Sequence, residues 1–391
     1  MGLAALALRR MRVFLYGTLC HPPLLRAVLG RAADVRPALL ADHAVFRGAG
    51  VDVPLLVPAP GETAPGQLLS GLDDEDMARL GFYEATFGYA ARNVTVSDDA
   101  GGPVPAVVFL PDTAPWGPGG AWSLADWAAR WGETATRTAG DVMALIAERD
   151  PAEVGQRYFH MLVRGASRVR AAAEPAPADR RRGAAAGDVA LARRRQPYAR
   201  FFSVEEYDLA FRRFDGAMSE TVNRAVFITG DAATVLPYDP HRDRVLLIEQ
   251  FRSGPYARGD RNPWLLEPVA GRIDPGETPE AAARREAREE AGLEIGALHL
   301  VGRYYPSPGV KSEFLYSYVG IAELPDTAAR IAGVDDEAED IRGHVLDFAA
   351  FMDIAASPEA AAAPVLISAL WLERNRAALR AGAPPSSVSR G

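Results

Sequence analysis

The chain has 391 residues with 43 basic and 51 acidic side chains, so its formal net charge is −8. This length exceeds the ~100–200 residues of one ordinary domain and predicts two domains, while the negative charge argues against a general nucleic-acid coating protein. Cys20 is the only cysteine, which excludes an internal disulfide framework and any zinc site built from several thiolates.

Neither a targeting signal nor a membrane span is predicted. Residues 1–8 are apolar, but no basic region precedes them and they are too short for the core of a signal peptide. No apolar run approaches the ~20 residues of a membrane-spanning helix. Met11 stands directly before the first expected strand and is an alternative start to Met1. We expect a cytoplasmic protein.

The first half mixes strand-like and helix-like segments. Residues 12–16 predict a short strand and residues 22–29 a helix, and helical spacing recurs over residues 122–146 and 154–163. Further strands are expected around the apolar segments at Val45, Leu55, Leu68, Val94 and Val107. We therefore predict an α+β domain over residues 11–165, including a helical extension.

The composition changes over residues 166–187, where alanine, proline and arginine follow one another without hydrophobic periodicity. Such a segment is typical of a flexible linker. The arginines at 180–182 offer the alternative of a nucleic-acid patch, but aromatic residues are not interleaved with them, so the linker interpretation is favoured.

The second domain is predicted over residues 188–382 as helices packed on a mixed sheet. Thr278 and Pro279 are a typical start for a helix, and Gly292 is a typical end for it. A closing helix is expected over residues 365–379. Strands are expected over residues 225–230, 232–239, 244–252, 315–321 and 345–348.

Three carboxylates share one face of the expected helix, because Glu286, Glu289 and Glu290 are spaced i, i+3 and i+4. Like charges at this spacing repel one another, and a bound cation would resolve the conflict. Oxygen ligands alone suit Mg²⁺, with Mn²⁺ as an alternative. A solvated acidic face balanced by neighbouring arginines is the competing interpretation.

The segment around these carboxylates resembles the Nudix box, Gly-x5-Glu-x7-Arg-Glu-U-x-Glu-Glu-x-Gly-U, from Gly271 to Leu293. The resemblance implies an α/β/α sandwich that hydrolyses a nucleoside diphosphate linked to another group, using divalent metal ions. It further implies that the metal is held by the box glutamates and by a carbonyl just before the box, that of Ala270. Arg285 would orient the glutamates.

The likeness continues outside the box, over about residues 189–379, and indicates the ADP-ribose pyrophosphatase branch. It is carried by residues 201–203, 218–219, 248–252, 264–267 and 307–309. The acidic loop 335–342 matches the branch loop that supplies a catalytic carboxylate. By its register Glu337 is favoured as the general base, and Glu339 is the alternative.

The resemblance to this branch also implies substrate contacts and a homodimer that shares its adenosine pocket between subunits. Arg224 and Arg252 can offer guanidinium forks to phosphate oxygens. Phe201 or Phe202 can stack on adenine, with a core position as the alternative. Glu313 matches a position near the terminal ribose, although an exposed strand-edge glutamate is nearly as well supported.

In the first half, the segment Tyr16, Gly17, Thr18 and Leu19 follows an apolar strand and resembles the signature of the γ-glutamylcyclotransferase-like (AIG2-like) family. The family fold is a mixed β-barrel with helices. The resemblance implies that Glu84 is an acid/base that helps a γ-glutamyl amine to cyclise and release 5-oxoproline. A domain of this fold without that reaction, with Glu84 as a solvent-facing residue at a helix end, is the alternative.

Together these resemblances predict a fusion of an AIG2-like domain with a Nudix ADP-ribose pyrophosphatase domain, similar to fusions among bacterial tellurite-resistance proteins. One rival is a Nudix hydrolase for another nucleotide-sugar diphosphate. The rival from a different class is a ligand-sensing protein that uses both domains as binding modules. In each case the expected partner is a small molecule, not a nucleic acid or a membrane.

Overall fold

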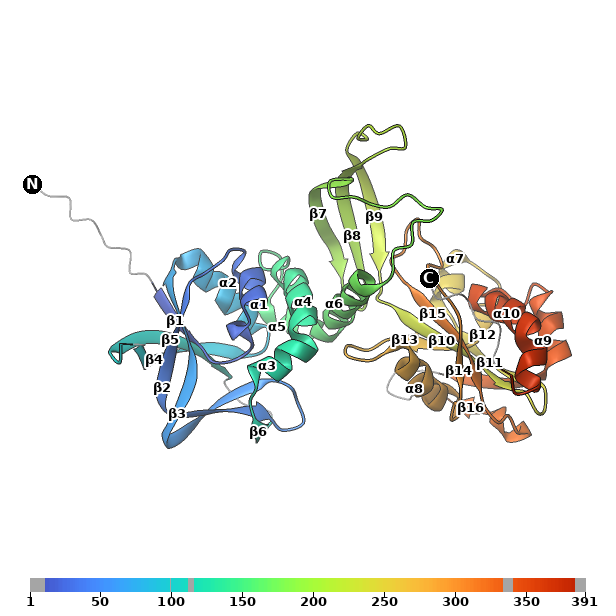
Figure 1. Cartoon of the computed structure of the whole chain (residues 1–391), viewed down its shortest axis with the longest axis horizontal. Coiled ribbons are helices and arrows are strands. Elements are labelled where there is room, and N and C mark those ends of the chain that lie inside the picture. Colours follow the sequence, from blue (N-terminus) through green and yellow to red (C-terminus); the bar gives the residue numbers. More distant parts are fainter. Residues whose placement is uncertain (1–10, 99, 112–115, 333–339, 384–391) are drawn as a thin grey trace, which may run out of the picture. The chain divides into compact units, whose positions relative to one another are not determined.

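The structure is a computed structural model that describes residues 11–98, 100–111, 116–332 and 340–383. The chain divides into two compact units, Met1–Ala173 and Glu174–Gly391 (Figure 1). Residues 174–188 form neither helix nor strand. Each unit is described by itself below.

The first unit is built on a closed barrel of five strands. Its order is β3-β1-β5-β4-β2, and a β2–β3 pairing closes the ring; β1 and β5 are parallel, while the other pairs are antiparallel. A short sixth strand adds to β2. The predicted mixed barrel is confirmed. The strands are β1 Met11–Leu15, β2 Val35–Gly48, β3 Pro54–Leu72, β4 Tyr89–Asp98, β5 Pro103–Pro111 and β6 Pro118–Ala121.

One difference from the expected strands concerns Leu55 and Leu68, which lie in the same long strand, β3. The proline- and glycine-rich segment between them would favour a break. It stays extended because β2 pairs with it through the register from Leu39↔Pro65 to Ala44↔Val57.

Helices cover one side of the barrel and carry the larger core of this unit. The predicted helix 22–29 is confirmed as α1, which begins at Pro22 and ends before the left-handed Gly30. Asp73 and Asp76 form a reciprocal capping box at the start of α2. The helices are η1 Thr18–Cys20, α1 Pro22–Leu29, α2 Asp74–Ala85, α3 Leu124–Trp127, η2 Ala128–Gly132, α4 Glu133–Met143, α5 Pro151–Gly155 and α6 Tyr158–Ala173.

The second unit is a sandwich in which helices cover both faces of a mixed sheet, as predicted. The sheet order is β14-β15-β10-β11-β17-β16, with β12 added to β11 and β13 to β10. The strands are β10 Ala232–Asp239, β11 Arg244–Phe251, β12 Trp264–Glu267, β13 Val269–Arg272, β14 Leu298–Tyr304, β15 Leu315–Ile321, β16 Ile331–Ala332 and β17 Ile341–Asp347.

The two faces of this sheet bury separate cores. On one face α8 (Pro279–Ala291) packs an alanine stripe, including Ala283 and Ala287, against residues such as Val235 and Ile248. On the other face α9 (Phe348–Ala355) and α10 (Ala363–Arg380) cover Leu236, Leu247 and their neighbours. A short helix, α7 (Ser253–Arg258), and the turn η3 (Asp326–Ala328) complete the unit.

A separate antiparallel sheet of three strands precedes the sandwich: β7 Val189–Ala199, β8 Ser203–Phe211 and β9 Val222–Ile228. Its turns and strands leave large apolar side chains in solvent. Phe214 is 96% exposed and Phe201 54% exposed, and Val189, Leu191 and Phe211 are also exposed. This unit therefore presents an unusually apolar surface on a small sheet.

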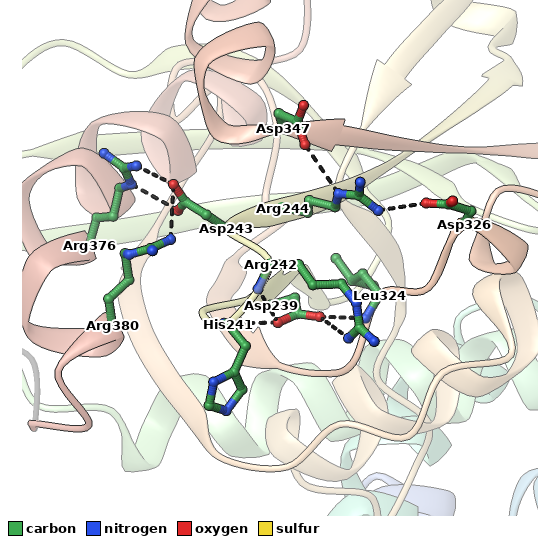
Figure 2. Close-up of polar contacts among 10 residues, drawn as sticks. All are labelled: Asp239, His241, Arg242, Asp243, Arg244, Leu324, Asp326, Asp347, Arg376 and Arg380. Carbon is green, nitrogen blue, oxygen red and sulfur yellow. Dashed lines mark hydrogen bonds and ion pairs between the residues drawn. The ribbon is translucent and has the colours of Figure 1, made fainter.

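The β10–β11 hairpin is fixed to the rest of the sandwich by ion pairs (Figure 2). Asp243, in the left-handed region with φ 59°, accepts hydrogen bonds from Tyr238 (2.8 Å) and Arg376 Nε (2.9 Å) and pairs with Arg380 (3.0 Å). Both arginines belong to α10. The turn between β10 and β11 is thereby tied to the last helix.

No helix in the described part of the chain is long and apolar enough to cross a membrane.

Candidate active sites

Helix α8 is the element that positions the carboxylates of the second unit. The Thr278 hydroxyl accepts a hydrogen bond from the Ala281 amide (3.1 Å), Pro279 occupies the first turn, and Gly292 closes the helix in the left-handed region at φ 61°. The alanine face of α8 is buried on the sheet, and from the rest of the helix Arg285 and Glu290 reach backbone groups of β13.

Arg285 joins the carboxylates of the box. Its Nε and Nη2 each donate to Glu277, at 3.1 Å, and its Nη1 donates to Glu286 (2.7 Å) and Glu289 (2.9 Å). Nη2 also donates to the Arg272 carbonyl oxygen (3.0 Å). Burial opposes the charge of the guanidinium, but the bond to Glu277 and the charge of Glu286 raise the pKa of Arg285.

Glu286 and Glu290 reach from α8 to β13. Glu290 is 3% exposed, and its Oε2 accepts a hydrogen bond from the Ala270 amide (3.0 Å). A Cβ on Gly271 would lie 1.8 Å from Glu286 Oε1, so only glycine leaves room for this carboxylate against the strand. Glu290 therefore lies beside Ala270, whose carbonyl was expected to complete the set, and Glu286 lies against the next residue, Gly271.

The donor set suits a hard divalent cation, because it contains only carboxylate and carbonyl oxygens. Among the described residues no group of three or more His, Cys, Asp or Glu side chains is arranged to hold a metal. In this structure Glu286 accepts a hydrogen bond from Arg285, and Glu290 accepts one from the Ala270 amide. The space that Gly271 leaves for Glu286, and the position of the glutamates on one face of α8, fit the expected binding of a divalent cation.

The two candidates for the general base, Glu337 and Glu339, lie outside the described residues. The residues that flank them are paired: Ile331 with Arg342 and Ala332 with Ile341, between β16 and β17. The described segments on either side of residues 333–339 are thus held side by side on the sheet.

The structure shows partners for the expected substrate-binding residues that the sequence did not indicate. Arg252 Nε donates to Glu267 (2.6 Å), across the β11–β12 pair. Arg224 lies exposed on β9 and donates to the Asn223 carbonyl (2.9 Å). The Arg252–Glu267 contact depends on the pairing of β11 with β12, which local spacing does not reveal, whereas the Arg224 contact is to the preceding residue.

Phe201, Phe202 and Glu313 are all at or near the surface of this unit. The Phe201 ring lies over the Arg272 guanidinium, 4.0 Å from its carbon, which links the small sheet to the strand preceding the box loop. The Phe202 ring packs at 4.1 Å from Phe227. Glu313 accepts from Lys311 Nζ (2.8 Å). Phe202 is therefore partly packed, while Phe201 is 54% exposed.

The first unit encloses a second candidate site, a pocket of about 550 Å³. Its lining includes the signature residues Tyr16, Gly17, Thr18 and Leu19 together with Glu84. The signature turn and Glu84 are distant in sequence, and the barrel and α2 bring them to one cavity. Glu84 thus lines a pocket; it is not simply a solvent-facing helix end.

Within the described residues, no hydrogen bond or ion pair engages the Glu84 carboxyl group. Burial raises its pKa to about 8. Tyr16 donates its hydroxyl proton to the Phe109 carbonyl (3.1 Å), and the Tyr89 hydroxyl donates to the Pro54 carbonyl (3.4 Å). The pocket therefore holds a carboxyl group that can take up or release a proton near neutral pH.

Comparison with known proteins agrees with this division. Residues 229–367 match the NUDIX domain family, and residues 13–128 match the family described as gamma-glutamyl cyclotransferase, AIG2-like. The chain is 42% identical over 193 residues to the ADP-ribose pyrophosphatase of Escherichia coli K12, covering 49% of this chain and 91% of that protein.

Two further relatives extend the comparison. The ADP-ribose pyrophosphatase of Haemophilus influenzae is 38% identical over 152 residues, covering 38% of this chain and 69% of that protein. The GDP-mannose pyrophosphatase of Klebsiella pneumoniae is 35% identical over 143 residues, covering 36% of this chain and 70% of that protein.

Proposed function

We propose that this chain, which belongs to the Nudix family through its second unit, hydrolyses the pyrophosphate bond of ADP-ribose to AMP and ribose 5-phosphate. The observation that carries the proposal is the clamp between α8 and β13, in which Arg285 holds Glu277, Glu286 and Glu289 while Glu290 reaches Ala270. Relatives named ADP-ribose pyrophosphatase support this choice of substrate.

Glu286, Glu289, Glu290 and the Ala270 carbonyl would hold Mg²⁺, with Mn²⁺ as the alternative. When bound, the ion would supply Lewis-acid stabilisation of charge on the phosphate oxygens. Arg285 keeps the carboxylates in position through its fork of hydrogen bonds.

The remaining steps belong to the acidic loop and to the substrate-binding residues. Glu337, or alternatively Glu339, removes a proton from the attacking water. Arg252 and Arg224 bind phosphate oxygens, and the exposed ring of Phe201 or that of Phe202 stacks on the adenine. The Glu313 carboxylate accepts hydrogen bonds from the terminal ribose hydroxyls.

Another nucleotide-sugar diphosphate is the alternative substrate, because the GDP-mannose pyrophosphatase of Klebsiella pneumoniae is also a relative. Measuring kcat/KM of the full chain for ADP-ribose, GDP-mannose and ADP-glucose distinguishes the proposed substrate from the alternative. The proposal expects ADP-ribose to be preferred by at least about tenfold, which corresponds to about 1.4 kcal/mol of transition-state binding. A preference for either of the other two would assign the alternative.

For the first unit, the carboxyl group of Glu84 in the pocket favours γ-glutamyl cyclotransferase activity. Glu84 would take a proton from the substrate amine that attacks the γ-carbonyl and return it to the amine that leaves. Release of 5-oxoproline by the full chain, and its loss in Glu84→Gln, test this activity. A pocket that binds γ-glutamyl compounds without releasing 5-oxoproline would favour the ligand-sensing alternative.

A homodimer formed through the second unit is also proposed. The exposed apolar side chains of the small sheet, Phe201 and Phe214 among them, favour burial against a second copy. The Phe201 ring, already placed over Arg272, would then line a pocket to which both subunits contribute.

A further inference from the structure

The first unit contains a second cavity, which lies beside the larger pocket and shares Asp52 and Trp127 with its wall. Its volume is about 420 Å³, within the range of about 300–1,000 Å³ that small-molecule sites occupy. The charged and aromatic residues of its lining are Arg47, Asp52, Trp122, Asp126, Trp127 and Arg130. Four of these six do not line the larger pocket, so the cavity is a separate place for a ligand.

Two arginines of this cavity converge on one carboxylate. Arg47 Nη1 and Arg130 Nη1 donate to the two oxygens of Asp52, at 3.4 Å and 2.7 Å. A guanidinium has five N–H donors, so each of these bonds engages only one nitrogen of its arginine. The two side chains are 49% and 59% exposed. Two neighbouring guanidiniums with further donors suit the carboxylate of a ligand.

Asp126 adds a negative charge close to this pair. It lies four positions before Arg130 on the continuous helical segment α3–η2, where such positions are neighbours. Arg130 nevertheless pairs with Asp52 in the loop between β2 and β3, and among the described residues no hydrogen bond or ion pair engages the Asp126 carboxylate. The turn η2 is π-helical, a rare form that occurs often at functional sites.

Two indole rings complete the cavity. The centroids of Trp122 and Trp127 are 6.4 Å apart, with the ring planes at 43°. Trp127 is buried and Trp122 is half-buried. Such a pair offers an apolar surface for another ring, which can add an edge-to-face or offset contact.

The charges of the lining favour a ligand that carries both signs. Arg47 and Arg130 are balanced by Asp52 and Asp126. A ligand with only a carboxylate would leave Asp126 unpaired and near a like charge, and a ligand with only an ammonium would meet the two guanidiniums. A ligand whose carboxylate and ammonium lie close together meets the opposite charge at each end.

We propose that this second cavity binds a free α-amino acid with an aromatic side chain. The carboxylate lies on Arg47 and Arg130, the ammonium lies on Asp126, and the side chain packs on Trp122 and Trp127. No covalent bond forms or breaks. The proposal does not involve Glu84 and is independent of the reaction proposed for the larger pocket.

Four compounds test this class of ligand. L-Phenylalanine carries both charges and the ring; 3-phenylpropanoate lacks only its ammonium, phenethylamine lacks only its carboxylate, and glycine lacks the ring. Binding of each to the full chain is measured by calorimetry. We expect L-phenylalanine to bind at least about tenfold more tightly than each of the other three. Absence of L-phenylalanine binding, or equal or tighter binding of any of the other compounds, would overturn the proposal.

Two substitutions assign the charges. Asp126→Asn should weaken binding of L-phenylalanine by about tenfold or more and leave that of 3-phenylpropanoate no weaker, because only the ammonium loses its partner. Arg47→Gln should weaken binding of L-phenylalanine by a similar factor and leave that of phenethylamine no weaker. A general loss of structure would weaken every compound alike, so this crossed pattern identifies direct contacts. Unchanged L-phenylalanine binding in either variant would overturn the proposal.

Matched controls lie outside both cavities. Arg137→Gln replaces an arginine that is also 49% exposed and also pairs with one carboxylate at 3.4 Å, that of Glu133. Asp74→Asn replaces an exposed acid in the first turn of α2, as Asp126 is in the first turn of α3. Both variants should bind L-phenylalanine as the unsubstituted chain does.

A last variant separates the two cavities. Glu84→Gln alters the larger pocket and should keep the affinity for L-phenylalanine, whatever happens to 5-oxoproline release. If Glu84→Gln lost L-phenylalanine binding, the ligand would lie in the larger pocket, and the proposal would be overturned. Absence of 5-oxoproline release together with intact L-phenylalanine binding would reject the cyclotransferase function and support the amino-acid site.

Discussion

Arg285 and Glu277 form a two-point contact: the arginine Nε and Nη2 each lie 3.1 Å from a carboxylate oxygen of Glu277. This fork joins the loop before α8 to the helix itself. The same guanidinium donates to Glu286 and Glu289, so one side chain sets the positions of three carboxylates.

We expect Arg285→Lys to lower kcat for ADP-ribose by about 10–100-fold, because lysine keeps the charge but cannot make the planar fork. Steady-state kinetics of the full chain measures this loss. Arg288→Lys is the matched control, since Arg288 lies one turn away and donates to the exposed Glu294 (2.9 Å). Equal losses in the two variants would contradict an orienting role for Arg285.

The second prediction concerns metal dependence. EDTA should abolish hydrolysis of ADP-ribose, and added Mg²⁺ or Mn²⁺ should restore it. Glu290→Gln keeps the volume and the acceptor for the Ala270 amide but removes the charge, so kcat should fall by on the order of 10²–10⁴ with the fold intact. Glu294→Gln, at an exposed position after the helix, is the control. Full activity in EDTA, or normal turnover of Glu290→Gln, would reject the metal site.

The third prediction assigns the general base. Glu337→Gln should lower kcat by about 100-fold or more with little change in KM, because a base acts on the reacting water and contributes little to substrate binding. Glu339→Gln should have a much smaller effect. If only Glu339→Gln lost activity, the role would pass to that residue.

Much of the catalytic helix could be predicted from the sequence because its signals are local. The Thr278 cap, the Gly292 end and the i, i+3, i+4 spacing of the glutamates all lie within one segment, and α8 has the expected bounds. In the structure, Glu277 of the same box lies beside Arg285. The same holds for α1, where Pro22 and Gly30 mark both ends.

Contacts between distant segments could not be predicted in this way. Arg272 lies on β13 and Phe201 in the turn between β7 and β8, and Asp243 and Arg376 are separated by 133 positions. Each pair depends on the tertiary fold, so no local sequence pattern indicates it. The single long strand β3 is a similar case, since pairing with β2 overrides its prolines and glycines.

The fourth prediction follows from the ion pairs of Figure 2. The bond from Arg376, aided by Tyr238 and Arg380 and opposed by burial, lowers the pKa of Asp243 from 3.8 to about 2. A carboxylate whose pKa is lower in the folded state stabilises the fold above the unfolded value and loses this contribution as pH falls through the folded value. The stabilising contribution of Asp243 is therefore present above pH 3.8 and is lost as the pH falls toward 2.

Asp243→Asn removes the charge while tolerating the left-handed backbone. It should lower the free energy of unfolding of the second unit by about 1–2 kcal/mol at pH 7, after allowance for solvent screening, and by much less near pH 2. Urea unfolding at both pH values measures the difference. Asp347→Asn, whose side chain is 74% exposed, is the control and should have little effect. An equal loss for Asp243→Asn at both pH values would attribute the effect to shape and not to charge.

The last prediction concerns assembly. Light scattering of the full chain should give twice the mass of a single chain, because burying rings such as Phe201 and Phe214 against a second copy is worth roughly 1.5–3 kcal/mol each when complete. Phe214→Asp changes a side chain that is 96% exposed, so it should dissociate the dimer without unfolding the unit. Leu370→Asp, 67% exposed on α10, is the control and should remain dimeric.

In the dimer, Phe201→Ala or Phe202→Ala should raise KM for ADP-ribose, since each removes a ring proposed to stack on the adenine. A monomeric chain whose Phe201→Ala and Phe202→Ala variants keep normal KM would contradict the shared pocket and leave both rings with packing roles alone.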